Sequence, residues 1–325
     1  MLYPLTFHPI FKERIWGGRN LEQLYQKNLP PKIPIGESWE ISDRPGDESI
    51  IANGPLAGKS IHWLMENHQE ELLGSAKPAL SGRFPLLIKI LDAQEKLSLQ
   101  VHPPAAKAVQ LGGEPKTELW YIADATPEAD LFVGLKRGAT RAEFEKRIQD
   151  GTVAECFPRL PVKKGDVMFL PSGRVHAIGA GNVIFEIQQN SDTTYRVFDW
   201  NRTDASGKPR ELHVEKSLDS IDFNDIEPGL VSDNLTDENG IKSRKLVIDS
   251  LFNVDFHELG ADKQFSLLPR TMQVVGLIEG RLEVLSAGRK LGLSAGQFVL
   301  IPASLETVTV QANVRCSFLN TVSGR

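Results

Sequence analysis

Turn-forming residues divide this chain into short apolar segments, and this pattern constrains its fold more than any other feature. The sequence has 27 glycines and 20 prolines, and many of them stand between runs of apolar or alternating residues. Such short, turn-bounded runs are typical of β-sandwiches and β-barrels. We expect strands at residues 84–91, 97–102, 118–123, 166–170, 183–189 and 195–200, and a second set at residues 246–257, 273–278, 281–286, 297–301 and 306–311.

Helical patterns are fewer than strand patterns. Residues 59–73 carry apolar side chains at helical spacing. Residues 140–150 open with Thr140 and have Glu143 three positions later, a spacing typical of a helix N-terminus. A short helix is also expected near residues 104–111. The chain is therefore predicted to be mainly β with a few short helices.

The polar, turn-rich residues 226–245 indicate a linker, so we predict two domains, residues 1–240 and 241–325. A glycine turn, a strand and a proline follow one another once in each domain. This repetition favours two related β-sandwiches, although two unrelated strand ends would give the same pattern. Only the first copy continues to a histidine, His176, so the second sandwich is expected to lack metal ligands.

Charge and cysteine content exclude several classes of protein. The chain has 37 basic and 42 acidic residues and a net charge of −5, which makes a nucleic-acid partner a poor prediction. An anionic substrate therefore needs a local basic cluster. Two cysteines, Cys156 and Cys316, cannot build a disulfide framework. No signal peptide or long apolar run is visible, so we expect a cytoplasmic protein with no membrane partner.

Three residues with metal-ligand chemistry lie on predicted strands. Side chains alternate faces along a strand, so Ser98, Gln100 and His102 share the polar face of residues 97–102. A half-exposed strand without a ligand would show the same alternation. Glu118 shares its strand face with large apolar residues, where a carboxylate is costly unless it is paired or bound to a metal. The alternative for this residue is an edge position that faces solvent.

The third residue, His176, begins a strand after a proline and a glycine turn, which places its imidazole at one end of the sandwich. A single histidine there is more often structural. Together with His102 and Glu118 it gives two histidines and one carboxylate, a set that suits Zn²⁺, or Fe²⁺ in oxygenases. Gln100 is positioned to add an oxygen ligand.

Basic and acidic side chains near this set indicate a polar pocket. Lys89 interrupts an apolar run, so it either reaches an edge or serves a site. Lys116 has the same strand parity as Glu118, and Glu186 and Arg196 lie on or near the later strands. With the arginines, the two lysines favour a cationic pocket for a phosphate group. Scattered surface charge is the alternative interpretation.

Six ordered motifs connect these observations: Ile15-Trp16-Gly17-Gly18, Trp39-Glu40-Ile41-Ser42, Phe84-Pro85-Leu86-Leu87-Ile88-Lys89, Gln100-Val101-His102-Pro103, Lys116-Thr117-Glu118 and Pro171-Ser172-Gly173-Arg174-Val175-His176. Their order and content resemble the short bacterial form of the type I mannose-6-phosphate isomerases. The similarity covers most of residues 1–220, and the C-terminal residues fit only the general plan.

The resemblance implies a cupin fold with two jelly-roll β-sandwiches and an isomerase that converts mannose 6-phosphate to fructose 6-phosphate. It also implies one Zn²⁺ per chain and a small-molecule sugar phosphate as partner. By matching motif positions, the metal ligands are Gln100, His102, Glu118 and His176. The residues matched to the substrate and its phosphate are Ser98, Lys89 and Trp16, and the catalytic candidates are Arg196, Lys116 and Glu186.

The chain departs from the longer members of that family in two ways. It has Pro115-Lys116-Thr117-Glu118 where those members read His-Lys-Pro-Glu, so Lys116 has different neighbours here. The span from Glu118 to His176 is also too short for their helical insertion. Two alternative functions stay open: an Fe²⁺-dependent dioxygenase of the cupin type and a non-catalytic sugar-binding cupin.

Overall fold

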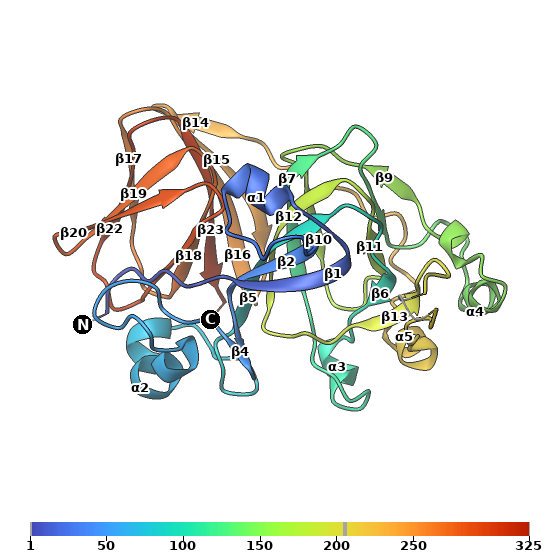
Figure 1. Ribbon diagram of the computed structural model, residues 1–325. Helices are drawn as coiled ribbons and strands as arrows, with labels where there is room; N and C mark the ends of the chain where they lie inside the picture. The colour runs from blue at the N-terminus through green and yellow to red at the C-terminus, as the bar shows by residue number, and fades with distance from the viewer. Residues whose placement is uncertain (1, 204–206, 325) are drawn as a thin grey trace.

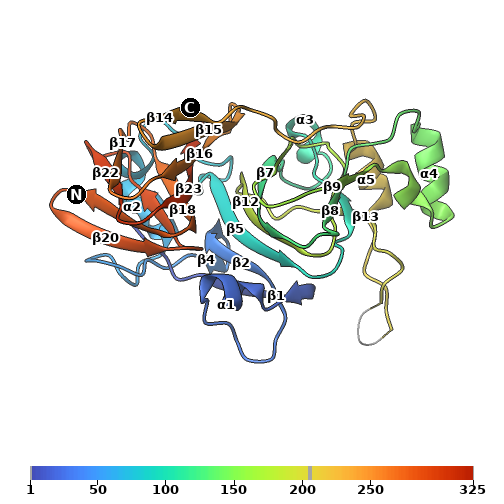
Figure 2. The same ribbon diagram turned by 90° about the horizontal axis from the view of Figure 1, so that it is seen from above.

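Four large antiparallel sheets form two β-sandwiches that lie side by side (Figures 1 and 2). The computed structural model describes residues 2–203 and 207–324. The first sandwich pairs a six-stranded sheet with a five-stranded sheet. The six-stranded sheet has, in spatial order, β1 (Ile10–Gly18), β2 (Ile35–Ile41), β5 (Leu86–Ala93), β12 (Asn182–Gln189), β7 (Glu118–Ala125) and β10 (Val167–Leu170). The five-stranded sheet has β13 (Tyr195–Phe198), β6 (Leu99–Val101), β11 (His176–Ile178), β8 (Asp130–Val133) and β9 (Arg159–Pro161).

The second sandwich has the same plan with a six-stranded and a four-stranded sheet. Its larger sheet contains β14 (Thr236–Glu238), β15 (Ile241–Ile248), β16 (Phe252–Leu259), β23 (Cys316–Ser323), β18 (Gln273–Glu279) and β21 (Phe298–Ile301). The smaller sheet contains β17 (Lys263–Leu267), β22 (Val308–Ala312), β19 (Arg281–Ser286) and β20 (Arg289–Ser294). A separate small hairpin is formed by β3 (Asp43–Arg44) and β4 (Asp47–Glu48). The prediction of a mainly β fold with two β-sandwiches is confirmed.

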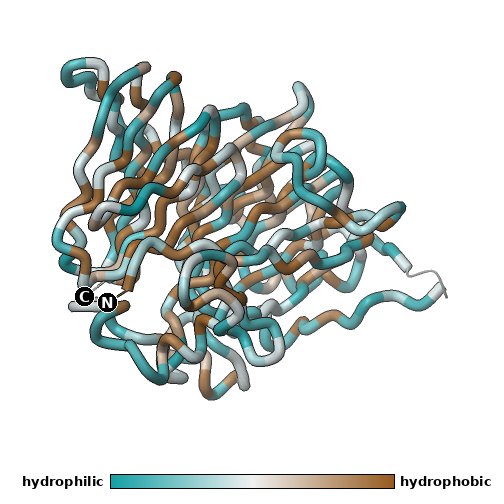
Figure 3. The backbone as a smooth tube through the Cα atoms, turned by 60° about the vertical axis from the view of Figure 1, so that its left-hand side comes forward, coloured by the Kyte–Doolittle hydropathy of each residue, from teal (hydrophilic) through white to brown (hydrophobic). Residues whose placement is uncertain are grey.

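The two six-stranded sheets pack against each other through the largest apolar cluster of the protein. In β5, Ile88 and Ile90 point into this cluster, where they join residues of the second sandwich such as Val274 and Leu300. Leu91, on the opposite face of β5, belongs to the core of the first sandwich. The strand is therefore buried on both faces, which explains its almost unbroken apolar sequence. Figure 3 shows apolar residues concentrated along the strands and hydrophilic residues in the outer loops.

Short helices cover the ends and the outer faces of the sheets. They are α1 (Asn20–Tyr25), α2 (Ile61–Leu73), α3 (Ala105–Ala108), α4 (Arg141–Gln149), α5 (Val214–Ser220) and a 3₁₀ turn, η1 (Val153–Cys156). The Thr140 hydroxyl accepts a hydrogen bond from the Glu143 amide at 3.2 Å, so the predicted cap of α4 is confirmed. Helices α4 and α5 lie beyond the five-stranded sheet (Figure 1), and Phe144 of α4 and Leu218 of α5 share an apolar cluster with that sheet. No helix within the described residues is long and apolar enough to span a membrane.

The linker predicted at residues 226–245 is wrong for its second half, which forms β14 and the start of β15. Asn239 and Gly240 join the two strands with positive φ angles of 56° and 81°. An Asn-Gly pair adopts this tight hairpin turn readily because both residues tolerate the left-handed conformation. The predicted division between residues 240 and 241 falls at this turn, and it stays a prediction.

Candidate active site

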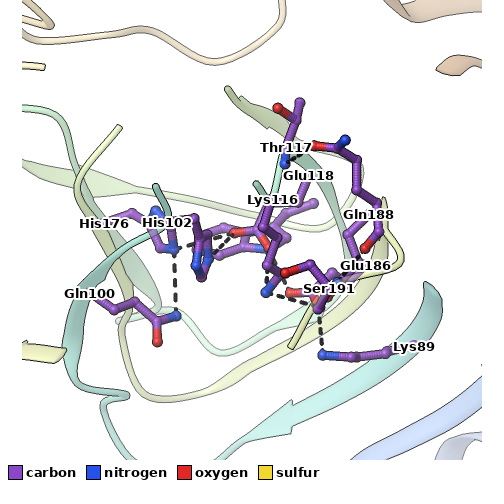
Figure 4. A network of polar contacts seen from close by, with 12 residues as sticks. Lys89, Gln100, His102, Lys116, Thr117, Glu118, His176, Glu186, Gln188 and Ser191 are labelled. Carbon is purple, nitrogen blue, oxygen red and sulfur yellow. Dashed lines mark hydrogen bonds and ion pairs between the residues drawn. The ribbon is translucent and has the colours of Figure 1, made fainter. Parts of the chain in front are cut away.

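The fold brings together His102, which directly follows β6, with Glu118 and His176, the first residues of β7 and β11 (Figure 4). His176 begins β11 and lies opposite Gln100 of β6, while Glu118 begins β7 in the facing sheet. The turn before β11 is tied down by a hydrogen bond from the Gly173 amide to the His102 carbonyl, at 2.9 Å. One ligand atom from each of the three residues lies within 4.8 Å of the others. All three side chains are buried.

The nearest oxygen of Glu118 faces both imidazole rings. His176 Nε2 lies 3.3 Å from Glu118 Oε1, and His102 Nε2 lies 3.7 Å from the same atom. Gln100 Nε2 lies 3.4 Å from His176 Nε2, so the fourth predicted ligand is at the edge of the same group. Because an amide can rotate to exchange its oxygen and nitrogen, Gln100 can also present an oxygen ligand here.

Each histidine is oriented by a main-chain carbonyl. His102 Nδ1 donates to the Thr193 carbonyl at 2.8 Å, and His176 Nδ1 donates to the Arg174 carbonyl at 2.9 Å. A carbonyl only accepts, so each Nδ1 carries the proton of the neutral ring. Burial lowers the pKa of His102 to about 4 and also lowers the pKa of His176. Both Nε2 atoms therefore present lone pairs to Glu118 at neutral pH.

These converging lone pairs fit a divalent cation. His102 Nε2 and Glu118 Oε1 are buried and have no hydrogen-bond partner in the described part of the chain. Two imidazole nitrogens and a carboxylate oxygen form the ligand set of many zinc sites, which leave a further position open. A carbonyl that holds the other ring nitrogen is the usual support of a ligating histidine. The residues present therefore fit the predicted zinc ion.

A polar cavity of about 420 Å³ adjoins this group. The structure brings seven of the predicted site residues to its wall: Trp16, Lys89, Ser98, Gln100, Lys116, Glu186 and Arg196. Charged groups that the sequence reasoning missed also line it: Arg14, Glu37, Asp192 and Arg210. The ligand group and the predicted substrate residues thus lie beside one another, as a metal-assisted reaction requires.

Lysines and glutamates alternate along one wall of the cavity. Lys89 Nζ lies 3.3 Å from Glu186 Oε1 and 3.6 Å from Glu37 Oε2. Lys89 is only 4% exposed, so it serves the site and does not reach an edge. In Figure 4 the Lys89 and Lys116 side chains approach Glu186 from two sides. The register explains this contact, because Lys89 of β5 lies directly opposite Glu186 of β12.

Lys116 connects this row of charges to the ligand group. Its Nζ lies 2.9 Å from Glu118 Oε2 and 3.9 Å from Glu186 Oε1. Burial alone would lower the pKa of Lys116, but the two carboxylates outweigh it and raise the pKa. In the absence of metal, Lys116 is therefore held as an ammonium ion. Glu186 is held from its other side by the Trp120 indole, which donates to Oε2 at 3.0 Å.

Glu37 is held as a buried carboxylate by two hydrogen-bond donors and the ion pair with Lys89. Arg14 Nε donates to its Oε1 at 2.7 Å, and Trp39 Nε1 donates to its Oε2 at 2.6 Å. Burial would raise the pKa of Glu37, but Lys89 and Arg14 outweigh it and lower the pKa to about 2. Glu37 and Trp39 are two positions apart and therefore share one face of their strand. This spacing is the sequence signal that would have marked Glu37 as a buried carboxylate.

Arg196 and Arg210 form a second, basic wall. Arg196 comes from β13, and its guanidinium donates to the Glu211 carbonyl at 2.8 Å. Its buried Nε has no hydrogen-bond partner within residues 2–203 and 207–324. Burial lowers the pKa of Arg196, and the neighbouring charge of Arg210 lowers it further. Arg196 therefore brings positive charge to the cavity from the five-stranded sheet, whereas Lys89, Glu37 and Glu186 come from the six-stranded sheet.

Comparison with known proteins shows which family this sequence resembles. Residues 5–145 match the family model described as phosphomannose isomerase type I, catalytic domain. Mannose-6-phosphate isomerase ManA of Bacillus subtilis is 35% identical over 315 residues, which are 96% of this chain and 97% of that protein.

Solved structures share the whole fold. The crystal structure of the mannose 6-phosphate isomerase from Bacillus subtilis superposes with a TM-score of 0.89 at 31% identity, and the match covers 98% of this chain and 99% of that one. A zinc-bound mannose 6-phosphate isomerase superposes with a TM-score of 0.79 at 16% identity over 100% of both chains, which shows a common fold. The sequence relationship extends over nearly the full length of the chain, so this protein belongs to the type I phosphomannose isomerase family.

Proposed function

We propose that this protein is a metal-dependent aldose–ketose isomerase that interconverts mannose 6-phosphate and fructose 6-phosphate. The observation that carries the proposal is the convergence of His102, Glu118 and His176 at a cavity lined by lysine, arginine and glutamate. The relatives named as mannose-6-phosphate isomerases match this chain over nearly its whole length, which supports the same substrate here.

Zinc is the metal that this ligand set favours, with one ion per chain. His102, Glu118 and His176 would hold it, and Gln100 is the candidate for an additional ligand. When bound, the ion would supply positive charge that stabilises negative charge on the sugar oxygens at C1 and C2. The reaction moves one proton between adjacent carbons and needs no redox cofactor.

Glu186 is the group best placed to move that proton. It lines the cavity, and its buried Oε1 has ion pairs with Lys89 and Lys116 but no hydrogen bond in the described residues. We assign it the role of base that removes the proton from C2 of mannose 6-phosphate and returns it to C1 through a cis-enediol. The hydroxyl proton passes from O2 to O1, so the atoms balance. A base within hydrogen-bond reach contributes about 10²–10⁴-fold to a rate.

The basic residues of the cavity hold the substrate and its developing charge. Lys116, kept protonated by Glu118 and Glu186, can donate a hydrogen bond to a sugar oxygen. Arg196 supplies a fixed positive charge for the enediolate, which needs no reorganisation during the reaction. Ser98, Trp16 and Lys89 line the same cavity and complete the proposed substrate contacts.

The experiment that tests this function measures fructose 6-phosphate formation from mannose 6-phosphate by the purified protein. Samples are assayed untreated, after chelation and after zinc is restored. We expect activity that chelation removes and zinc restores. No activity in zinc-loaded protein, together with iron-dependent oxygen uptake, would support the dioxygenase alternative. Tight sugar binding without turnover would support the non-catalytic alternative.

A further inference from the structure

The charges of the cavity are distributed unevenly. Five basic and three acidic residues line it, a difference of two positive charges in a chain whose net charge is −5. Lys89, which the sequence resemblance associates with the phosphate, lies between the carboxylates of Glu37 and Glu186. A phosphate dianion beside Lys89 would be repelled by those two carboxylates. The positive charge that binds the phosphate must therefore come from other residues.

That charge lies on the opposite wall, where three arginines surround one aspartate. Asp199 is 6% exposed on its side chain and pairs with both Arg202 and Arg210. Arg210 Nε lies 2.6 Å from Asp199 Oδ2, and its NH2 lies 2.5 Å from Oδ1, so the two groups form a bidentate pair. With Arg196 beside them, the four groups carry a net charge of about +2.

Two of these arginines reach the cavity and one does not. Arg196 and Arg210 line it together with Ser98 and Thr194, whereas Arg202 lies outside the lining. Arg202 instead donates to the Lys96 carbonyl at 2.6 Å. The bidentate contact fixes the plane of the Arg210 guanidinium at the cavity wall. Because the side chain is already ordered, it loses less conformational entropy when it binds an anion.

We propose that Arg210, positioned by Asp199, binds the 6-phosphate of the substrate and makes the enzyme prefer phosphorylated sugars. This inference rests on the proposed isomerase function. A phosphate carries about 1.5 to 2 negative charges at neutral pH, which matches the net charge of the arginine cluster. Ser98 and Thr194 add hydroxyl groups at the same wall, and Arg196 stays available for the enediolate.

The test replaces Arg210 by glutamine, which removes the charge and keeps an amide donor. We expect the KM for mannose 6-phosphate to rise about tenfold or more, while kcat changes less than about twofold. The kcat/KM for unphosphorylated mannose should not change. Equal loss on both sugars would show a general structural role, and an unchanged KM for the phosphorylated sugar would also overturn the proposal.

Arg202→Gln is the matched control, because Arg202 pairs with the same aspartate but does not line the cavity. We expect its KM for mannose 6-phosphate to stay within about twofold of the unaltered protein. Arg210→Lys keeps the charge without the bidentate geometry and should give an intermediate KM. Circular dichroism and thermal unfolding would reveal whether Arg210→Gln folds poorly. In that case Arg210→Lys replaces it as the test variant.

Calorimetric titration with inorganic phosphate separates this inference from the proposed function, because it does not depend on turnover. Phosphate binding that is weakened about tenfold or more by Arg210→Gln, and retained in Arg202→Gln, supports the inference even if the substrate is not isomerised. Asp199→Asn should weaken phosphate binding and raise KM without lowering kcat, as expected of a positioning residue. Equal phosphate binding by the unaltered protein and Arg210→Gln would overturn the assignment.

Discussion

Lys116 Nζ lies 2.9 Å from Glu118 Oε2, while the other oxygen of that carboxylate lies 3.3 Å from His176 Nε2. One buried carboxylate is thus shared between the candidate metal ligands and the basic side of the substrate cavity. Burial works against its ionisation, but the Lys116 ammonium outweighs it and holds the pKa of Glu118 well below its usual range. Glu118 is therefore an anion at neutral pH.

Replacement of Glu118 by glutamine should abolish metal binding and activity together. The variant keeps the side-chain volume but loses the only carboxylate among the three ligands. We expect zinc affinity to fall about 100-fold or more, since even outer-sphere changes cost 10- to 100-fold. Metal content by mass spectrometry measures this. Glu114→Gln, four residues earlier and paired with Arg44 at the surface, is the control and should keep its zinc.

Glu186→Gln should separate chemistry from metal binding. We expect kcat to fall about 10²- to 10⁴-fold because the group that moves the proton is lost. Zinc content should stay at one ion per chain, since Glu186 is not among the three ligands. The loss of solvent hydrogen exchange at C2 of the bound sugar would locate the defect in proton removal. Normal turnover in this variant would assign the base to another group.

The ligands could be predicted from sequence because each carries a local signal. Strand alternation placed Gln100 and His102 on one face, and the apolar surroundings of Glu118 marked it as an unusual carboxylate. Their convergence could not be derived from spacing, because it depends on which strands become neighbours. The ordered motifs shared with a known family supplied that information.

The charge network around Lys89 could not be predicted, since it is a property of sheet order. Lys89 meets Glu186 because β5 lies next to β12, and it meets Glu37 because β2 lies on the other side of β5. These strands are far apart in the sequence. Arg210 was missed for a different reason, because it follows β13 in an irregular segment where no periodicity marks it.

Packing between the two sandwiches should dominate the stability of the protein. Ile88 is fully buried in the cluster between the six-stranded sheets. We expect Ile88→Ala to lower the free energy of unfolding by about 2–5 kcal/mol, because it leaves a cavity in a close-packed core. Chemical denaturation measures this. Ile248→Ala is the control on an exposed residue, 72% accessible, and should change stability by less than about 0.5 kcal/mol.

His257 should make the second sandwich sensitive to acid. Its ring lies between Phe265 and Phe318, and its Nδ1 contacts the Ser243 hydroxyl at 2.8 Å. Burial lowers the pKa of His257 to about 4, against about 6.5 in the unfolded chain. Between these values the unfolded state binds more protons, so stability is lost as pH falls from 6.5 through 4. The loss from this group is about 3 kcal/mol.

The pH dependence of unfolding in His257→Gln isolates this contribution. The variant lacks the titrating ring, so its stability should fall less steeply over the same pH range than that of the unaltered protein. At pH 7 and above the two slopes should coincide, because the histidine is neutral in both states there. Parallel curves down to pH 4 would contradict the role of His257.

The central claim is that one zinc ion in the His102–Glu118–His176 group supports isomerisation in the adjoining cavity. The most direct measurement titrates zinc into chelated protein while following both bound metal and conversion of mannose 6-phosphate to fructose 6-phosphate. We predict that activity rises in proportion to bound zinc and reaches its maximum at one ion per chain. Full activity in the metal-free protein, or stoichiometric zinc binding without any activity, would contradict the account.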